Sequence, residues 1–489
     1  MKRFVNIIII SLLLVAGLAI APGSAQVAQA AATVTYNLYA TDGFINMADG
    51  VQVYTYGFVG GRQGVPLTYQ ISTAAKVNPG GIATITGGSP APTAGPITAA
   101  EAPLAGNAQF PAPLIYATTT DVVQINLKNL GVALGTAPND PHTIHLHGLD
   151  VNAANDGVPE TSVAAVPANA KKTPGAGNIV VYMFAPQHPG TYMYHCHQEA
   201  DIHVQMGMYG ALVIYNPTDA AAVTGPGLGN GGELWGWRYD KDYVLLLSEF
   251  DLGQHVAEQK GGVAGAYNPV NYKPQYWFIN GLSFPNTIHA GLGFIWANWI
   301  AAHPNYDPFI VGSVGTSQKV LLRVINMGFE VQPMHMHGFH AKIIGSDQRA
   351  WPWANDPLVT PFGKGLEKNT LTIGSGETYE WLIGFGQQTL NSTYDVGVQT
   401  RYDPLTNLPQ GNTNSLSPAI PDPFAPGFAY VGGPTVGPVD QASQGPGGLP
   451  PELPFTLGQY FPFHNHDDYK ATNNGLYPGG MFTMILTLP

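Results

Sequence analysis

Short apolar-rich runs of the strand type recur along the chain and are separated by turns rich in glycine, proline and asparagine. Three examples are Asp121–Lys128, Tyr243–Ser248 and Gln318–Ile325. Alternation of apolar and polar positions with a period of two is typical of β-strands that bury one face. No long stretch has the apolar period of an α-helix, so the pattern predicts an all-β protein built from sandwiches or barrels.

The N-terminal segment has a different pattern. Two basic residues precede an apolar run from about Phe4 to Ala21, and small residues follow it. This order is typical of a secretory signal peptide, which we assign to residues 1–30. The run also reaches the lower limit for a membrane span, so an uncleaved anchor is the alternative. We expect an exported protein that is periplasmic, on the cell surface or secreted.

The chain contains an internal repeat. Three segments have counterparts later in the sequence: His142–Gly148 with Gln332–Gly338, Tyr192–His197 with Phe461–His466, and Gly207–Ile214 with Gly480–Thr487. Two similar units in tandem explain these matches most simply.

The repeat sets the expected domain boundaries. We predict one domain over residues 31–218, a Gly/Pro-rich linker over 219–237 and a second domain over 238–489. In the second unit His337 and His464 are 127 residues apart, whereas in the first unit His147 and His195 are 48 residues apart. Most of this excess is assigned to an insertion at about 387–454, which is rich in proline and glycine.

Composition narrows the range of functions. Only 10% of the residues are charged and the formal net charge is -12. This balance argues against nucleic acid as a partner and mildly favours cationic substrates. The chain has one cysteine, Cys196, which cannot form an internal disulfide. In an oxidising compartment an unpaired thiol has to be buried, cross-linked or bound to metal.

Paired histidines are the strongest chemical signal. Chance predicts about half of one His-x-His pair in such a chain, yet there are four: His145/His147, His195/His197, His335/His337 and His464/His466. On a strand, residues i and i+2 share a face and lie roughly 6.6 Å apart, so each pair presents two imidazoles in one direction. Eight such imidazoles can hold several copper ions, although zinc and iron accept similar ligands.

Cys196 lies between His195 and His197, so on a strand its thiol faces the opposite way. His142 and the following loop residues His203 and Met208 supply the other donors of a blue-copper site, in which two histidines, a thiolate and a distant methionine bind the metal. The alternative role for Met208 is core packing, which is the role expected for the neighbouring Met206. The second unit has Gln332 and Asn465 in place of His142 and Cys196, so one such site per chain is expected.

These motifs together resemble those of the multicopper oxidases, which are laccase-like proteins with cupredoxin domains. The resemblance implies two tandem cupredoxin-like domains of the Greek-key sandwich type and three kinds of copper site. A type 1 copper at His142, Cys196, His203 and Met208 would receive electrons and pass them through Cys196. Type 2 copper would bind His145 and His335, and the type 3 pair would bind His147, His195, His197, His337, His464 and His466, where O2 is reduced to water.

The resemblance also implies a proton relay and an assembly. Asp156 matches the acidic residue near the copper cluster in this family, and Asp467 and Asp468 are weaker candidates. Because the type 1 ligands lie in the first unit, the chain is similar to two-domain multicopper oxidases, which form head-to-tail trimers. Glu199 and Asp201, between Cys196 and His203, are either substrate contacts or solvated loop charges.

Two other kinds of copper protein fit the sequence less well. A copper nitrite reductase needs only three histidines at its catalytic copper, and an electron-transfer cupredoxin would use the Cys196 site alone. Both leave several of the four pairs unexplained. Among oxidases, a laccase that acts on phenolic or other organic molecules competes with a metallo-oxidase that acts on Fe(II), Mn(II) or Cu(I).

Overall fold

The computed structural model describes residues 32–488, except 73–80, 137–138, 263–266, 289–295, 314–315, 352–365, 386–400, 403–408 and 411–458. The predicted signal segment 1–30 lies outside the described residues, as does the predicted insertion 387–454 apart from the hairpin β23 (Arg401–Tyr402) and β24 (Pro409–Gln410). Among the described residues, none of the helices has the length and apolar character needed to cross a bilayer.

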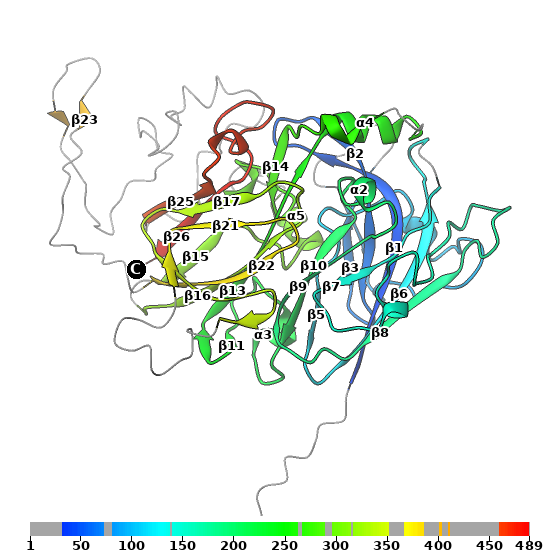
Figure 1. Ribbon diagram of the computed structural model, residues 1–489, viewed down its shortest axis with the longest axis horizontal. Helices are drawn as coiled ribbons and strands as arrows, with labels where there is room; N and C mark the ends of the chain where they lie inside the picture. The colour runs from blue at the N-terminus through cyan, green and yellow to red at the C-terminus, as the bar shows by residue number, and fades with distance from the viewer. Residues whose placement is uncertain are drawn as a thin grey trace, which may run out of the picture. The chain divides into compact units, whose positions relative to one another are not determined.

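The first half of the chain forms two four-stranded sheets that enclose one apolar core (Figure 1). The core includes Tyr36 and Ile125 from one sheet and Leu212 from the other, all almost fully buried. In spatial order the first sheet is β2 (Gln52–Arg62), β1 (Thr33–Asn46), β6 (Val122–Gly131), β8 (Ile179–Phe184), and the second is β5 (Ile115–Thr118), β10 (Tyr209–Tyr215), β9 (Gly190–His195), β7 (His145–His147). A small hairpin joins β3 (Leu67–Gln70) and β4 (Ile82–Ile85).

The second half repeats this plan around Leu322, Trp381 and Ile485. One sheet has the order β14 (Tyr276–Ile279), β13 (Lys241–Phe250), β16 (Lys319–Asn326), β22 (Thr378–Gly384), β18 (Ala341–Ser346), β19 (Arg349–Ala350), with β20 (Leu366–Lys368) beside β18. The other has the order β15 (Ile310–Ser313), β26 (Phe482–Leu488), β25 (Gln459–Asn465), β17 (Gln332–Met336), β21 (Thr370–Ile373). The hairpin β11 (Gly232–Leu234), β12 (Trp237–Tyr239) precedes this half.

The predicted repeat is a repeat of strand pairing. β1 pairs in parallel with β6 as β13 does with β16, and β10 pairs in parallel with β5 as β26 does with β15. Even the register of the histidine strands agrees, because His145 lies opposite His195 and His335 opposite His464. The three predicted strands are confirmed as parts of β6, β13 and β16.

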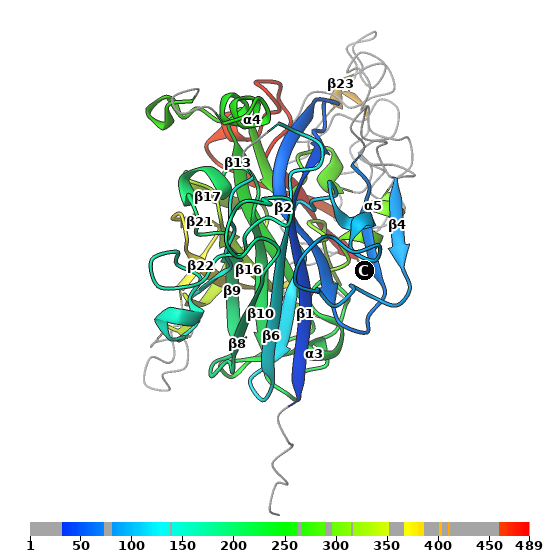
Figure 2. The same cartoon turned by 90° about the vertical axis from the view of Figure 1, so that its right-hand side faces the viewer.

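Helices are short, as the absence of long helical periodicity predicts. In the described part of the chain they are α2 (Ala200–His203), α3 (Ala221–Thr224), α4 (Leu252–Gln259) and α5 (Trp296–Ala302), and single 3-10 turns occur at Ala102–Leu104, Ala153–Asn155, Pro269–Asn271, Asn286–Ile288 and Asp468–Lys470. The side chain of Asp251 caps α4 by accepting the N–H of Gly253 at 2.7 Å, which satisfies one of the free donors at the helix start. Helix α4 lies against β2 at the upper end of the molecule in Figure 2.

A third apolar cluster joins the two halves. Phe110 from the first half packs on Phe250 and Phe278 from the second, with ring centroids 4.7 and 5.2 Å apart. The described residues from Thr33 onward therefore belong to one compact unit, and the domain boundaries at 218 and 238 remain a prediction.

Candidate metal centres

The structure brings together three of the four predicted type 1 ligands. The Sγ of Cys196 lies 3.7 Å from Nδ1 of His142 and 3.3 Å from Nδ1 of His203, and these two nitrogens are 3.3 Å apart. All three side chains are buried, and the only hydrogen bond that Sγ accepts from the backbone comes from Thr143 at 3.4 Å among the described residues. Two imidazoles and a thiol converging on one point are the donor set of a blue-copper site.

Met208 lies in the same buried cluster as Cys196, and its carbonyl accepts the Cys196 N–H at 3.0 Å. Met206 is equally buried there. Ligation by the Met208 sulfur therefore stays a prediction.

The charges of this site favour a bound cation. Burial, followed by the neighbouring His203, holds the pKa of His142 well below its usual value. At His203 burial also lowers the pKa, but the negative charge of Cys196 and the carboxylate of Asp140 outweigh it and raise the pKa to about 10. The negative potential at His203 would equally stabilise a metal ion.

The first two histidine pairs converge on the opposite side of β9. Nitrogens of His145, His147 and His195 lie within 4.8 Å of one another, and the ring of His197 lies 5.3 Å from that of His145. We call these four residues the first quartet. Burial lowers the pKa of His195 to about 3, so it stays neutral and able to bind metal at physiological pH.

Backbone carbonyls orient two of these rings. Nδ1 of His145 lies 2.8 Å from the Asp156 carbonyl, and Nδ1 of His195 lies 3.0 Å from the Cys196 carbonyl. A carbonyl only accepts, so Nδ1 carries the proton and Nε2 keeps the lone pair for a metal.

The last two pairs form the second quartet: His335, His337, His464 and His466. Nε2 of His337 lies 3.2 Å from Nε2 of His464, and the rings of His335 and His466 are 5.1 Å apart. Nδ1 of His464 faces the carbonyl of Asn465 at 2.9 Å, as that of His195 faces Cys196 in the other half.

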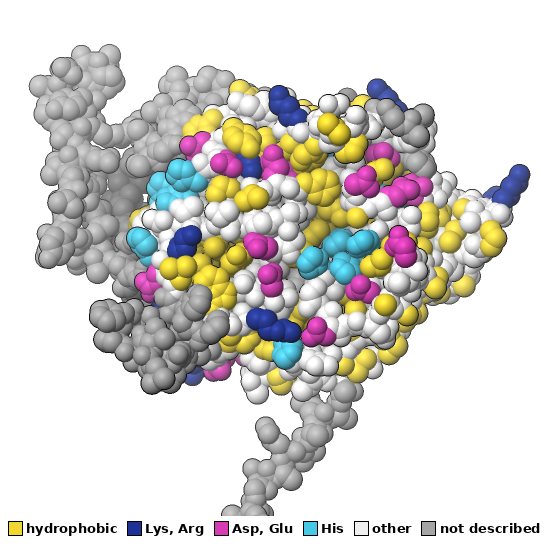
Figure 3. Space-filling view, viewed as in Figure 1, with side chains coloured by type: hydrophobic (Ala, Val, Ile, Leu, Met, Phe, Trp, Pro, Cys, Tyr) yellow, Lys and Arg dark blue, Asp and Glu magenta, His cyan; other side chains and the backbone are white. Residues whose placement is uncertain are grey.

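The two quartets do not meet within one chain. Ring contacts join histidines inside each quartet, and Figure 3 shows the histidine side chains in separate groups, one over β7 and β9 and the other towards β17 and β25. A cluster that uses both quartets would therefore need two chains.

Two of the three acidic residues predicted as proton relays lie close to histidines of the quartets. Oδ1 of Asp156 is 3.2 Å from Nδ1 of His145. Asp468 lies 3.8 Å from Nδ1 of His464, whereas Asp467 pairs with Lys470 at 3.3 Å. Asp156 therefore keeps its place as the first candidate, and Asp467 has an alternative structural role.

Sequence reasoning named Glu199 but missed Asp140, Tyr56 and Glu258 beside the type 1 site. Oδ2 of Asp140 is 3.9 Å from Nε2 of His203, and ligand atoms of Asp140, Glu199 and His203 lie within 4.8 Å of one another. Glu258 on α4 accepts the hydroxyl of Tyr56 at 3.3 Å, and Asp140 and Glu199 contribute to raising its pKa after burial. These residues come from separate elements with no shared motif, so only folding reveals them. Asp201, by contrast, is exposed, and its carbonyl accepts from Gln254 at 3.1 Å.

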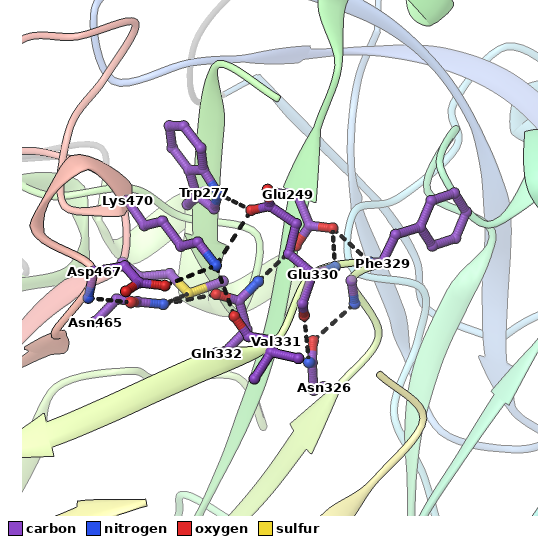
Figure 4. A network of polar contacts seen from close by, with 12 residues as sticks. Glu249, Trp277, Asn326, Phe329, Glu330, Val331, Gln332, Asn465, Asp467 and Lys470 are labelled. Carbon is purple, nitrogen blue, oxygen red and sulfur yellow. Dashed lines mark hydrogen bonds and ion pairs between the residues drawn. The ribbon is translucent and has the colours of Figure 1, made fainter. Parts of the chain in front are cut away.

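The counterpart of the type 1 site in the second half holds a hydrogen-bond network instead of metal ligands (Figure 4). Nδ2 of Asn465 donates to Oε1 of Gln332 at 2.6 Å and to the sulfur of Met481 at 3.4 Å. Nε2 of Gln332 donates to Glu249 at 2.8 Å. The amide groups satisfy one another, as the sequence predicts for a position without copper.

Comparisons with known proteins show which proteins this chain resembles. Residues 85–218 match the family model described as Multicopper oxidase. Putative laccase-9 from Oryza sativa subsp. japonica is 28% identical over 319 residues, which cover 64% of this chain and 45% of that protein. L-ascorbate oxidase from Nicotiana tabacum is 26% identical over 338 residues, which cover 65% of this chain and 50% of that protein. The chain thus spans about half the length of these relatives.

Solved structures agree on the fold. The blue copper oxidase from Nitrosomonas europaea superposes with a TM-score of 0.51 at 20% identity, covering 93% of this chain and 86% of that one. The all-β cupredoxin fold predicted from the sequence is confirmed. Residues 85–218 are therefore similar to a multicopper oxidase domain, the chain is similar to a laccase and an ascorbate oxidase over about two thirds of its length, and these similarities support copper as the cofactor.

Proposed function

We propose that this chain is a copper-dependent oxidase that couples one-electron oxidation of a small reducing substrate to the four-electron reduction of O2 to water. The observation that carries the proposal is the end of β9, where the thiol of Cys196 faces His142 and His203 while His195 and His197 belong to the first quartet. Copper bound at both places would accept electrons singly and supply four of them to O2. Cys196 and its two neighbours would connect the sites through covalent bonds.

The protein residues have separate tasks in this reaction. His142, Cys196, His203 and Met208 would hold the electron-accepting copper, and the two quartets would hold the copper ions that supply electrons to O2. Asp156, next to His145, is proposed to relay protons, because the reduction of one O2 to two water molecules requires four protons.

We propose that the reducing substrate is a metal cation such as Fe(II) or Mn(II). Carboxylates of Asp140, Glu199 and Glu258 gather beside His203, and none of the ion pairs among the described residues joins Glu199 or Glu258 to lysine or arginine. Nε2 of His203 is buried and has no hydrogen-bond partner within the described residues, where the Asp140 carboxylate lies 3.9 Å away. A cation between these carboxylates and His203 would lie next to the electron acceptor. A phenolic substrate is the second candidate, and it has no comparable support.

We further propose that the chain assembles as a head-to-tail homotrimer and is exported. In that arrangement the first quartet of one chain would meet the second quartet of the next. The separation of the quartets within a chain supports this assembly, and the signal-like N-terminus supports export.

The central test is Cys196→Ser in copper-loaded protein. We expect loss of the blue absorption band and of oxygen uptake with any reductant, because serine cannot replace a thiolate ligand of this copper. Asn465→Ser is the matched control, since it changes the equivalent position of the other half, and its blue band should remain. Fewer than two copper ions per fully loaded chain would contradict the cluster, and nitrite consumption without oxygen uptake would instead support a nitrite reductase.

The substrate is tested with Glu258→Gln and Asp140→Asn. We expect KM for Fe(II) and Mn(II) to rise about tenfold, or about 1.4 kcal/mol, while oxidation of a neutral phenol keeps its rate. Glu233→Gln, an exposed site elsewhere, controls for the change in net charge. An equal loss for phenol and metal ions would contradict a cation site.

A further inference from the structure

Glu249 on β13 is 1% exposed and accepts four hydrogen bonds. Its donors are the hydroxyl of Tyr272 at 2.8 Å, the side-chain amide of Gln332 at 2.8 Å and the backbone N–H groups of Phe329 and Glu330. Figure 4 shows the Glu249 carboxylate with its contacts to Gln332, Phe329 and Glu330. Burial raises the pKa of Glu249 to about 7, although these donors lower it. Four converging donors fit a carboxylate, because both of its oxygens only accept when it is ionised.

On one side the network reaches the loop of the type 1 site. Tyr272 accepts from Nε2 of Gln205 at 3.2 Å, and the same amide donates to the Glu249 carbonyl at 3.0 Å. Oε1 of Gln205 accepts the Asp251 N–H at 2.6 Å. Gln205 is buried and lies between His203 and Met208, two of the proposed copper ligands.

On the other side the network reaches the second quartet. Because Nε2 of Gln332 donates to Glu249, its Oε1 is directed to Nδ2 of Asn465 at 2.6 Å. Oδ1 of Asn465 in turn accepts the N–H of Asp467 at 2.9 Å. Asn465 lies between His464 and His466, so its side chain fixes the strand end that presents both rings.

We infer that Glu249 is a positioning residue for both copper centres: it fixes the His203–Met208 loop through Tyr272 and Gln205, and the His464–His466 segment through Gln332 and Asn465. Gln205 and Asn465, which Glu249 orients through its neighbours, are not proposed ligands themselves. In the sequence, Gln205 lies between the proposed ligands His203 and Met208, and Asn465 lies between His464 and His466. The role as a copper-site residue rests on the proposed function, while the mechanical coupling does not.

The test compares three variants with the wild type. Glu249→Gln places an NH2 group against a donor and should loosen both segments. Tyr272→Phe removes the hydroxyl and should loosen only residues 203–208, and Gln332→Leu should loosen only residues 464–468. Glu380→Gln is the matched control, because Glu380 is also a fully buried glutamate with a pKa raised by burial, but it contacts Thr191 and neither segment.

Two measurements separate positioning from general stability. In copper-free protein, hydrogen exchange of the named segments should accelerate at least tenfold in the corresponding variants and stay unchanged in Glu380→Gln. In copper-loaded protein, the blue band and its EPR splitting should shift in Glu249→Gln and Tyr272→Phe and stay as in the wild type in Gln332→Leu.

The outcomes are distinguishable. Exchange in Glu249→Gln equal to that in Glu380→Gln would overturn the inference, and so would exchange in Tyr272→Phe or Gln332→Leu that spreads equally to both segments. If Glu249→Gln does not fold, the other two variants decide. A wild type without a blue band would refute the proposed function, while the exchange rates would still test the coupling.

Discussion

Single imidazoles point in different directions at the two kinds of site. At the proposed type 1 site, Nδ1 of His142 and Nδ1 of His203 face Cys196. In the quartets, carbonyls hold Nδ1 of His195 and His464 and leave Nε2 free. Because a fixed tautomer decides which nitrogen can bind metal, the backbone around each histidine determines its role.

The buried carboxyl group of Glu380 should make the stability of the protein depend on pH. Burial raises its pKa to about 7, above the usual value of about 4.3 in an unfolded chain. The folded state therefore keeps a proton that the unfolded state releases, and stability falls as the pH rises from about 4.5 to about 7. Glu380→Gln does not titrate, so we expect its unfolding free energy relative to wild type to increase over this range by up to about 3 kcal/mol.

Urea unfolding at pH 5 and pH 8 measures this effect. Glu233→Gln provides the control, because Glu233 is exposed and its replacement should change stability equally at both pH values. A constant difference between Glu380→Gln and wild type from pH 5 to pH 8 would show that Glu380 is ionised normally in the folded protein.

Some residues of the candidate site could be predicted from the sequence, and others could not. Cys196 and its neighbouring histidines were predictable because a strand alternates its side chains with a period of two. Asp140, Tyr56 and Glu258 were not, because they reach His203 from a loop, from β2 and from α4. Their meeting depends on packing between the two halves, which local spacing does not encode.

At the scale of elements, β9, β13 and β16 are held together by a buried charge. Nε of Arg323 on β16 lies 2.7 Å from Oδ2 of Asp242 on β13, and its NH1 lies 3.4 Å from the hydroxyl of Thr191 on β9. The guanidinium also lies over the ring of Tyr215, 5.0 Å from its centroid. These contacts join the second half of the chain to the first.

Arg323→Leu should destabilise the protein strongly, because it leaves the Asp242 carboxylate buried without a positive charge, with only the Tyr215 hydroxyl still donating to it at 2.9 Å among the described residues. Loss of one member of a buried pair costs about 3–5 kcal/mol. Chemical unfolding of Arg323→Leu measures the cost, and Arg349→Leu is the control, since its pair with Asp150 is exposed and should contribute about 0–1 kcal/mol. Equal stabilities of the two variants would contradict the proposed joining role.

Strand prediction succeeded where burial alone decides the pattern. β6, β13 and β16 contain the predicted runs, since a core strand needs little beyond apolar residues and turns. Helix α4 was not predicted, because its eight residues are too few to show a clear helical period. Four of these residues are buried, and two of those hydrogen-bond to the loop that carries the type 1 ligands, so the apolar pattern is weakened further. Its capping residue Asp251 was the available signal.

At the scale of the whole molecule, the separated quartets make assembly testable. One variant would carry His145→Ala and His147→Ala, and a second would carry His335→Ala and His337→Ala. We expect each alone to lose oxygen uptake, because each interface lacks half of its ligands. Mixed assemblies contain some interfaces with both intact quartets, so co-expression should restore part of the activity.

Co-expression of the first variant with itself under a second tag is the control for protein amount. No activity in the mixed assemblies, with both variants folded and assembled, would contradict a cluster between chains. Light scattering of the wild type gives the number of chains independently.

The exposed second quartet determines what a newly made, unassembled chain can do. His337 is exposed on the single chain, and no histidine of the first quartet contacts it among the described residues. Under the proposed assembly, a lone chain can collect copper without possessing a complete centre for oxygen. Dilution would then switch the enzyme off, and the four-electron reduction of oxygen would begin only after the ring of chains has closed.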